Sequence, residues 1–353
     1  MIHPFDLRRK FVRSVLTPLS SSLIALVAGI AVSLAMLLFF SGQPVSAAVD
    51  FFTGPFASRF YVGTLLNTAS LLMWAGVGAG IAIASGNLNL GGEGQIYLAG
   101  FITAVVLSKG SGIVPPFLLL PIAGFTACAA AAVCAGVAAL FKQFRGSSEL
   151  LVSFLVSAVT IPLVDAAIAG PFRDTARNLL ATPPVPAEFR LERILPPSPL
   201  TVSFFAAAAF CLVSACVLYR TRAGRAVRVC GAAPQFAQYA GYSLAAHSFG
   251  ALCLSGACHG LTGFFAVVGT YYTCHSGFYA GMGWNALSCA LIARSNPAAV
   301  IPSALLLSWI FTAADRSAMM YDFPFDMTGL IQAAVLFCIS ARFVGAAKRA
   351  RSA

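Results

Sequence analysis

The sequence predicts an all-α integral membrane protein, a bundle of about ten transmembrane helices with a short helix in a cytoplasmic loop. Charged residues make up only 9% of the 353-residue chain, whereas a soluble domain carries about 25%. Apolar residues make up 59% of it, and several runs exceed the roughly 18 uncharged residues typical of a membrane-spanning helix. The bulk of the chain is therefore expected to lie in lipid.

The first apolar run, residues 19–40, follows a basic segment, residues 1–18. It is longer than the apolar core of a cleavable signal peptide, which has about 7 to 15 residues, so we expect a retained helix whose basic flank stays in the cytoplasm. The remaining nine runs are 62–85, 94–108, 113–141, 150–170, 199–219, 249–270, 284–293, 298–314 and 328–341.

The distribution of charge predicts which loops face the cytoplasm. If the chain crosses at each run, most Lys and Arg residues fall on the side of the amino terminus, as the positive-inside rule requires. Both termini, including the tail 346–353, are then cytoplasmic. The net charge of +11 is read as this topological signal, and no nucleic-acid surface is predicted. Acidic residues expected outside are Asp50, Asp174, Glu188, Glu192, Asp315, Asp322 and Asp326.

Two loops interrupt the apolar pattern. The outer loop, 171–198, is rich in proline and reads as a surface segment. The inner loop, 220–248, is the one sizeable cytoplasmic loop and is long enough for a short amphipathic helix. The glycines at 76, 78 and 80 and at 256, 260 and 263 are typical of closely packed membrane helices.

The chain lacks the motifs of common enzymes. No phosphate-binding loop, nucleophile elbow or HExxH motif is present, so we predict a transport subunit and no catalytic residues. The ten cysteines lie mostly in apolar runs without a CxxC pair. Even Cys258 beside His259 is interpreted as helix packing, and neither a metal nor a cofactor is predicted.

The segment from Asn87 to Gln95 places amides, a carboxylate and glycines between two apolar runs. Irregular backbone at membrane depth is tolerated where it is buried in protein or lines a cavity. The segment is therefore either a re-entrant element near the substrate or a tight turn at the membrane surface.

Three segments resemble the permeases of nucleoside-type ATP-binding cassette importers. Residues 89–95 are similar to the family signature Asn-Ile-Gly-x-Glu-Gly-Gln, and 281–297 resemble a second family pattern. The inner loop, at 228–234 and 239–241, resembles the segment by which these permeases dock their ATPase. The chain departs from the family at Ala233, Trp284, Asn285 and Ala293, which leaves the scaffold intact and the cargo open.

The resemblance implies a permease domain, residues 19–345, and several partners. These are an ATPase subunit, a second paralogous permease, an external or lipoprotein substrate-binding protein, a small-molecule substrate and membrane lipid. The residues expected to couple transport to the ATPase are Gly224, Arg225, Arg228, Gly231, Pro234, Tyr239, Ala240 and Gly241.

The expected cargo is a small polar heteroaromatic solute crossing the inner membrane, a nucleoside first, then riboflavin, then a sugar. An aromatic ring and several amides suit such a ligand, and the residues expected in the pathway are Asn67, Asn87, Asn89, Glu93, Gln95, Trp284 and Asn285. Two other classes stay open. One is a carrier that works without ATP and uses Glu93 and Asp165 as coupling groups, and the other is a membrane scaffold without flux.

Overall fold

The computed structural model describes residues 42–177, 179–321 and a few positions within 27–39 and 329–337. In these residues the regular elements are helices, joined by loops. The chain divides into two compact units. The larger comprises Phe56–Trp309, and the smaller combines Met1–Pro55 with Ile310–Ala353. The first and tenth expected spans, 19–40 and 328–341, lie largely outside the described residues.

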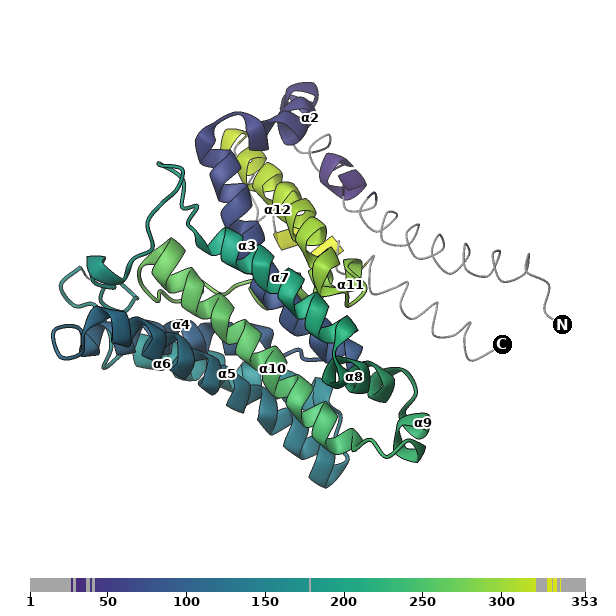
Figure 1. Ribbon diagram of the computed structural model, residues 1–353. Coiled ribbons are helices and arrows are strands. Elements are labelled where there is room, and N and C mark those ends of the chain that lie inside the picture. The colour runs from purple at the N-terminus through teal and green to yellow at the C-terminus, as the bar shows by residue number, and fades with distance from the viewer. Residues whose placement is uncertain are drawn as a thin grey trace, which may run out of the picture. The chain divides into compact units, whose positions relative to one another are not determined.

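The larger unit is organised around one helix, α10 (Leu244–Phe265), which a π-helical turn extends to Tyr271. It packs against α3 (Arg59–Ala84), α4 (Gly92–Gly110) and α5 (Pro116–Arg145). Helix α6 (Glu149–Ala169) lies beside α4 and α5, and α7 (Ser203–Arg220) lies beside α3, as Figure 1 shows.

Glycines set the close approach of these helices. A Cβ at Gly263 of α10 would overlap the Ile96 carbonyl oxygen of α4, and a Cβ at Gly78 of α3 would come within 2.8 Å of the Ser255 carbonyl oxygen of α10. Only a residue without a side chain lets two backbones meet in this way. The expected role of these glycines in helix packing is confirmed at these two positions.

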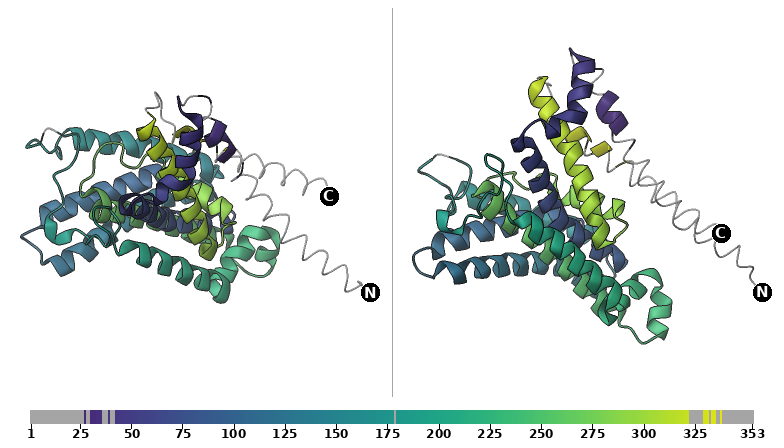
Figure 2. Two further views of the ribbon diagram at one scale, coloured as in Figure 1. Left: turned by 90° about the horizontal axis from the view of Figure 1, so that it is seen from above. Right: turned by 45° about the horizontal axis from the view of Figure 1, so that its top comes forward.

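The inner loop contains two short helices, α8 (Arg222–Ala232) and α9 (Pro234–Tyr239). The Thr221 hydroxyl caps α8 by accepting a hydrogen bond from the Gly224 N–H at 3.1 Å, a common way to begin a helix. Both helices lie beyond the ends of α7 and α10 in each view of Figure 2. The loop therefore projects from the bundle.

Six described helices are long and apolar enough to cross a membrane: α3, α5, α6, α7, α10 with its π turn, and α12 (Pro297–Met320). The expected span at 284–293 is instead an 11-residue helix, α11 (Met282–Ile292). At 1.5 Å per residue it covers about 16 Å of a hydrocarbon layer about 30 Å thick. It is a half-span, and the count of ten crossing helices is not established.

The smaller unit contains α2 (Pro44–Thr53) and the end of α12 from Ile310. Asp50 accepts a hydrogen bond from the Tyr321 hydroxyl at 3.1 Å and lies 3.8 Å from the Arg316 guanidinium. Asp315, which was expected in an outer loop, lies inside α12, because the helix continues past the apolar run on which the expected boundary rested.

Candidate functional site

Lys142, Arg145 and the inner loop, which were predicted to face the cytoplasm, gather at one end of the larger unit, which we call the basic end. It comprises the end of α5, the start of α6, the turn after α3, helices α8 and α9, and the start of α10. Lys142 of α5 pairs with Glu149 of α6 at 3.2 Å. The Ser248 hydroxyl of α10 and the Lys142 ammonium both donate to the Asn87 side-chain oxygen, at 2.9 and 2.6 Å.

Asn87 is therefore a buried junction at the basic end. It is 1% exposed, and its amide nitrogen donates to the Ser85 hydroxyl at 2.6 Å. One side chain thus joins the turn after α3 to α5 and α10. The sequence did not single out the partners Lys142 and Ser248, because a contact between residues so far apart in the chain leaves no local pattern.

Three of the expected coupling residues fix α8 to the bundle. A Cβ at Gly231 would overlap the Ala84 carbonyl oxygen, and a Cβ at Gly224 would overlap the carbonyl oxygens at the end of α7. The Arg228 guanidinium donates from Nε to the Leu218 carbonyl oxygen at 3.1 Å and stacks on the Tyr219 ring at 4.7 Å. Arg228 thus satisfies the carboxyl end of α7.

The other expected coupling residues, Arg225, Pro234, Tyr239, Ala240 and Gly241, are exposed. Tyr239 is 93% exposed, and Phe236 on the same short helix is 63% exposed. Two large aromatic side chains with so little cover mark a surface that suits a protein partner. Sequence analysis missed Phe236, although an aromatic residue within a polar loop is a signal that could have revealed it.

The broken segment, residues 85–91, runs from the basic end into the bundle interior and leads into α4. Asn89 lies at the centre of a buried polar network there. Its amide nitrogen donates to the Gln95 side-chain oxygen at 2.9 Å and to the Ser255 hydroxyl at 3.0 Å. His259 Nδ1 lies 2.7 Å from the same Gln95 oxygen. The side chains of Asn89, Gln95 and Ser255 thus pair with one another inside a single chain. Among the described residues, His259 Nε2 is buried without a hydrogen-bond partner.

Two serines of α6 complete the support of the segment. The Ser153 hydroxyl accepts from the Leu90 N–H at 3.0 Å, and the Ser157 hydroxyl accepts from the Gly94 N–H at 2.8 Å. Both serines are buried on a helix whose other positions are mainly apolar. The backbone groups freed by the break are therefore paired by side chains, as membrane depth requires.

Glu93, in the first turn of α4, caps the start of α11. Its Oε1 accepts from the Gly283 N–H at 2.8 Å and the Trp284 N–H at 3.2 Å. Both glycines at this contact, Gly92 and Gly283, let the two helix starts meet, since a Cβ at Gly283 would lie 2.5 Å from the Glu93 nitrogen. Two segments that resemble the family thus touch in space.

Of the remaining expected pathway residues, Asn67 lies apart from this contact, whereas Asn285 follows Trp284 in the first turn of α11. The Asn67 amide of α3 donates to the Thr270 hydroxyl at 3.0 Å, in the π turn of α10. Asn285 is 7% exposed in the first turn of α11, next to the half-buried Trp284. Trp284 is the most accessible of the seven.

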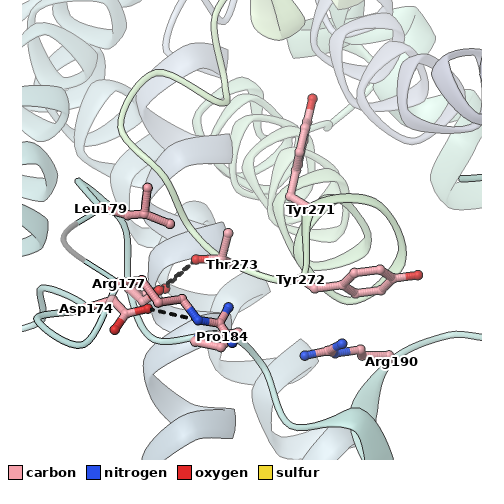
Figure 3. Close-up of a pocket in the computed structure, with 9 residues that line it drawn as sticks. Asp174, Arg177, Leu179, Pro184, Arg190, Tyr271, Tyr272 and Thr273 are labelled. Atoms are coloured by element: carbon pink, nitrogen blue, oxygen red, sulfur yellow. Dashed lines mark hydrogen bonds and ion pairs between the residues drawn. The ribbon is translucent and has the colours of Figure 1, made fainter.

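The opposite end of the larger unit has a small cavity, shown in Figure 3, of about 220 Å³. The outer loop and the end of α10 line it. Asp174 and Arg177 lie on one side, with the rings of Tyr271 and Tyr272 across from them. The Arg190 guanidinium stacks on the Tyr272 ring at 5.1 Å. The lining of the cavity thus combines charged side chains with aromatic and apolar ones.

Comparison with known proteins identifies the family. Residues 61–340 match the model described as the permease component of branched-chain amino acid transport systems. A probable riboflavin import permease of Treponema pallidum is 38% identical over 328 residues, which are 92% of this chain and 85% of that protein.

More distant relatives have other names. A glucose ABC transporter permease of Haloferax volcanii is 26% identical, over 91% of this chain and 87% of its own. A guanosine ABC transporter permease of Bacillus subtilis is 23% identical, over 91% and 92%. The expected resemblance to ATP-binding cassette permeases is confirmed, and with it the expectation of a transport subunit. The chain belongs to the family of permease components of branched-chain amino acid transport systems.

Proposed function

We propose that this chain is the membrane-spanning subunit of an ATP-binding cassette importer that carries riboflavin across the cytoplasmic membrane. The observation that carries the cargo is the 38% identity to a riboflavin import permease over 92% of the chain. Riboflavin is a planar heteroaromatic solute with polar edges, the class of cargo expected from the sequence. It now precedes nucleosides, because the guanosine permease is only 23% identical.

Nucleosides are the second candidate. The segment 89–95 resembles the signature of nucleoside-type permeases, and a guanosine permease aligns over 91% of the chain. A sugar is the third, supported by the glucose permease of Haloferax volcanii.

The inner loop is the proposed docking element for a separate ATPase. Its two short helices project from the basic end and carry the exposed Phe236 and Tyr239. We assign Tyr239, Pro234, Ala240, Gly241 and Arg225 to contact with the ATPase. Gly224, Arg228 and Gly231 act instead by packing α8 against the bundle. A movement of the loop caused by the ATPase is then transmitted to the turn after α3.

The remaining partners follow from the same proposal. A second permease completes the pore, and an external binding protein delivers the cargo. The basic end then faces the cytoplasm together with both termini, in agreement with the positive-inside rule, and lipid surrounds the exposed apolar faces.

Within the chain, we divide the seven pathway residues by their partners. Asn67, Asn87, Asn89 and Gln95 shape the pathway indirectly, because their side chains are buried and hydrogen-bonded inside the chain. Trp284, half-buried beside Asn285 on α11, is the residue proposed to reach the cargo. The capping role of Glu93 argues against a carrier that uses this carboxylate to move protons.

Uptake by vesicles tests the cargo. Vesicles carrying this chain with its ATPase, second permease and binding protein receive labelled riboflavin, guanosine, uridine and glucose in separate reactions, with and without ATP. ATP-dependent uptake of riboflavin supports the proposal. ATP-dependent uptake of guanosine or uridine alone would support an ATP-driven importer and contradict riboflavin as its cargo. Uptake without ATP favours a secondary carrier, and no flux of any solute favours a scaffold.

Binding of the ATPase tests the docking element. Replacing Tyr239 with Ala removes an exposed aromatic anchor, so we expect association with the ATPase to weaken by about 30-fold, as for an interface hot spot worth about 2 kcal/mol. Phe144→Ala is the matched control, because Phe144 is 74% exposed on α5 at the same end and outside the loop. Equal association of both variants would contradict the assigned surface.

A further inference from the structure

Two carboxylates from different helices accept hydrogen bonds from the same segment of the chain. This segment is the α10–α11 connection, residues 272–281, together with the first turn of α11. Asp165 of α6 binds it near its middle, and Glu93 of α4 binds it where α11 begins. We propose that the α10–α11 connection is the moving gate of this permease, and that Asp165 and Glu93 are positioning residues that hold it shut. The inference rests on the proposed transport function.

The outer contact centres on one oxygen of Asp165. Its Oδ1 accepts a hydrogen bond from the Ser276 hydroxyl at 2.8 Å and one from the Tyr97 hydroxyl of α4 at 2.6 Å. The carboxylate thus ties the connection to α4 and α6 at once, and loss of either donor weakens the same point.

The inner contact uses the start of a helix. The first N–H groups of a helix have no partner within it, and Glu93 supplies one by accepting from Gly283 and Trp284 at 2.8 and 3.2 Å. The positive end of the α11 dipole also favours a carboxylate there. If α11 moves away, these N–H groups need another acceptor, so the contact favours one discrete position.

The connection has the backbone features of an element that can change shape. Tyr272, Gly277 and Gly281 have φ values of 57°, 81° and 80°, in the left-handed region that disfavours a regular helix or strand. Ser276 and Gly277 are exposed. Hinges are often a few such residues at the ends of helices.

Aromatic side chains of the α10–α11 connection pack against α4 in the closed position. The Phe278 ring fills the space over Gly100, where a Cβ would overlap it, and the Tyr279 ring lies 4.5 Å from the Tyr97 ring. The outer loop adds a further contact, since the Thr182 hydroxyl accepts from the Cys274 N–H at 3.0 Å. Packed side chains of this kind shift between separate arrangements more readily than they deform continuously.

A reversible cross-link tests whether the connection must move. Asp165→Cys and Ser276→Cys together place two thiols where the side chains now touch, and oxidation is verified by peptide mass mapping in the assembled, ATP-free transporter. We expect oxidation to abolish ATP-dependent riboflavin uptake and a reductant to restore it. Uptake by the oxidised pair at the rate of the reduced pair would overturn the proposal, as would failure of the two thiols to cross-link.

A second pair at the same end is the matched control. The Ser111 hydroxyl donates to the Glu188 carboxylate at 3.0 Å and links the end of α4 to the outer loop without the connection. Oxidised Ser111→Cys with Glu188→Cys is expected to transport at the rate of its reduced form. Loss of uptake in this pair as well would assign the effect to general stiffening of the outer end and not to the gate.

Release of the gate supplies an independent readout. Ser276→Ala removes one donor and leaves the Asp165 side chain in place, so we expect the gate to open without ATP about tenfold more often, the effect of losing one hydrogen bond. Efflux of labelled riboflavin from preloaded vesicles without ATP measures this. Adding Asp165→Asn to Ser276→Ala is expected to raise efflux by less than the product of the two single effects. If Ser276→Ala and Asp165→Asn each showed the efflux of the wild type, the proposed role of Asp165 in holding the gate shut would be contradicted.

The two proposals fail differently. If the wild-type assembly takes up no riboflavin, the proposed function is wrong. If the wild-type assembly transports and the oxidised Asp165→Cys, Ser276→Cys pair transports equally well, the function stands and the gate is wrong.

Discussion

Helices α3 and α10 differ sharply from α5, α6 and α7 in how their apolar residues are used. In the most apolar stretch of α3, 83% of residues are buried within the chain, and in α10 the share is 72%. The corresponding shares are 28% for α5 and α6 and 22% for α7. The least buried helices include the most apolar sequences, whereas the central pair carries glycines, serines, one amide and two histidines.

This difference shows that burial inside the bundle does not follow the hydropathy of a helix, because the central pair combines apolar residues with small and polar ones. Lipid tails are as apolar as leucine, so the hydrophobic effect does not drive helices together inside a membrane. Small residues let the central helices approach one another closely, and many bulky apolar residues of α5, α6 and α7 are exposed on the chain. Adding a bulky side chain to a central helix should therefore destabilise the protein, whereas removing one from an outer helix should have little effect on stability.

The largest expected effect comes from enlarging a central glycine. Gly263→Leu forces a side chain into the Ile96 backbone, so we expect the amount of folded protein recovered from membranes to fall by at least tenfold, since a clash with backbone cannot be relieved by a rotamer change. Gly250→Leu on the same helix is the control, because a Cβ there meets no atom within 4 Å. Equal recovery of the two variants would contradict the proposed need for close helix packing at the centre of the bundle.

Removing a central amide should have an intermediate effect. Asn89→Leu leaves Gln95 and Ser255 without a partner they now have, and an unpaired buried polar group costs about 1–3 kcal/mol. We expect the midpoint of thermal unfolding in detergent to fall by several degrees, with a loss of ATP-driven uptake. A midpoint equal to that of the wild type would show that the network adds nothing to stability.

Disturbing the packing of α8 against the bundle should change the stability of the protein less than it changes the coupling of ATP hydrolysis to transport. Gly231→Ala pushes a methyl group against the turn after α3, so we expect ATPase binding within about threefold of wild type and uptake per ATP hydrolysed reduced several-fold. Ala232→Val, at an exposed position next to it, is the control. Unchanged uptake per ATP in the Gly231 variant would remove its role in coupling.

The smallest effect is expected on the outer faces. Leu155→Ala on α6, at a position 52% exposed, should change the unfolding midpoint by less than the error of the measurement, because surface substitutions stay within about 0.5 kcal/mol. The comparison becomes sharper if the same variant is tested for association with the second permease. A loss of association would assign this face of α6 to the partner and not to lipid.

The sequence predicted the class of fold and most helices well because each long apolar run carries its own signal. The runs at 62–85, 113–141 and 150–170 correspond to α3, α5 and α6 with shifts of a few residues. It misjudged α11, whose apolar run looks like a short span until its length is compared with the bilayer. The added length of α12 was missed because Asp315 looked like a loop residue.

The candidate site was predicted only in its local part. The segment 87–95 was identified because its polar residues are adjacent in the chain. Its partners His259, Ser255, Ser153 and Lys142 come from other helices, and a single serine or histidine in an apolar run does not indicate which residue it meets. Likewise, the sequence singled out Glu93 and Asp165 but could not show that both bind the α10–α11 connection.

The shortness of α11 has a consequence for how the protein is made. Eleven residues are too few for insertion as an independent span, so we expect α11 to enter the bilayer only beside helices already in place. The carboxylate that caps its first turn belongs to α4, which is synthesised nearly two hundred residues earlier. Glu93 therefore has no α11 to cap until residues 282–292 have been synthesised, and we expect the final assembly of the bundle to follow the synthesis of α11.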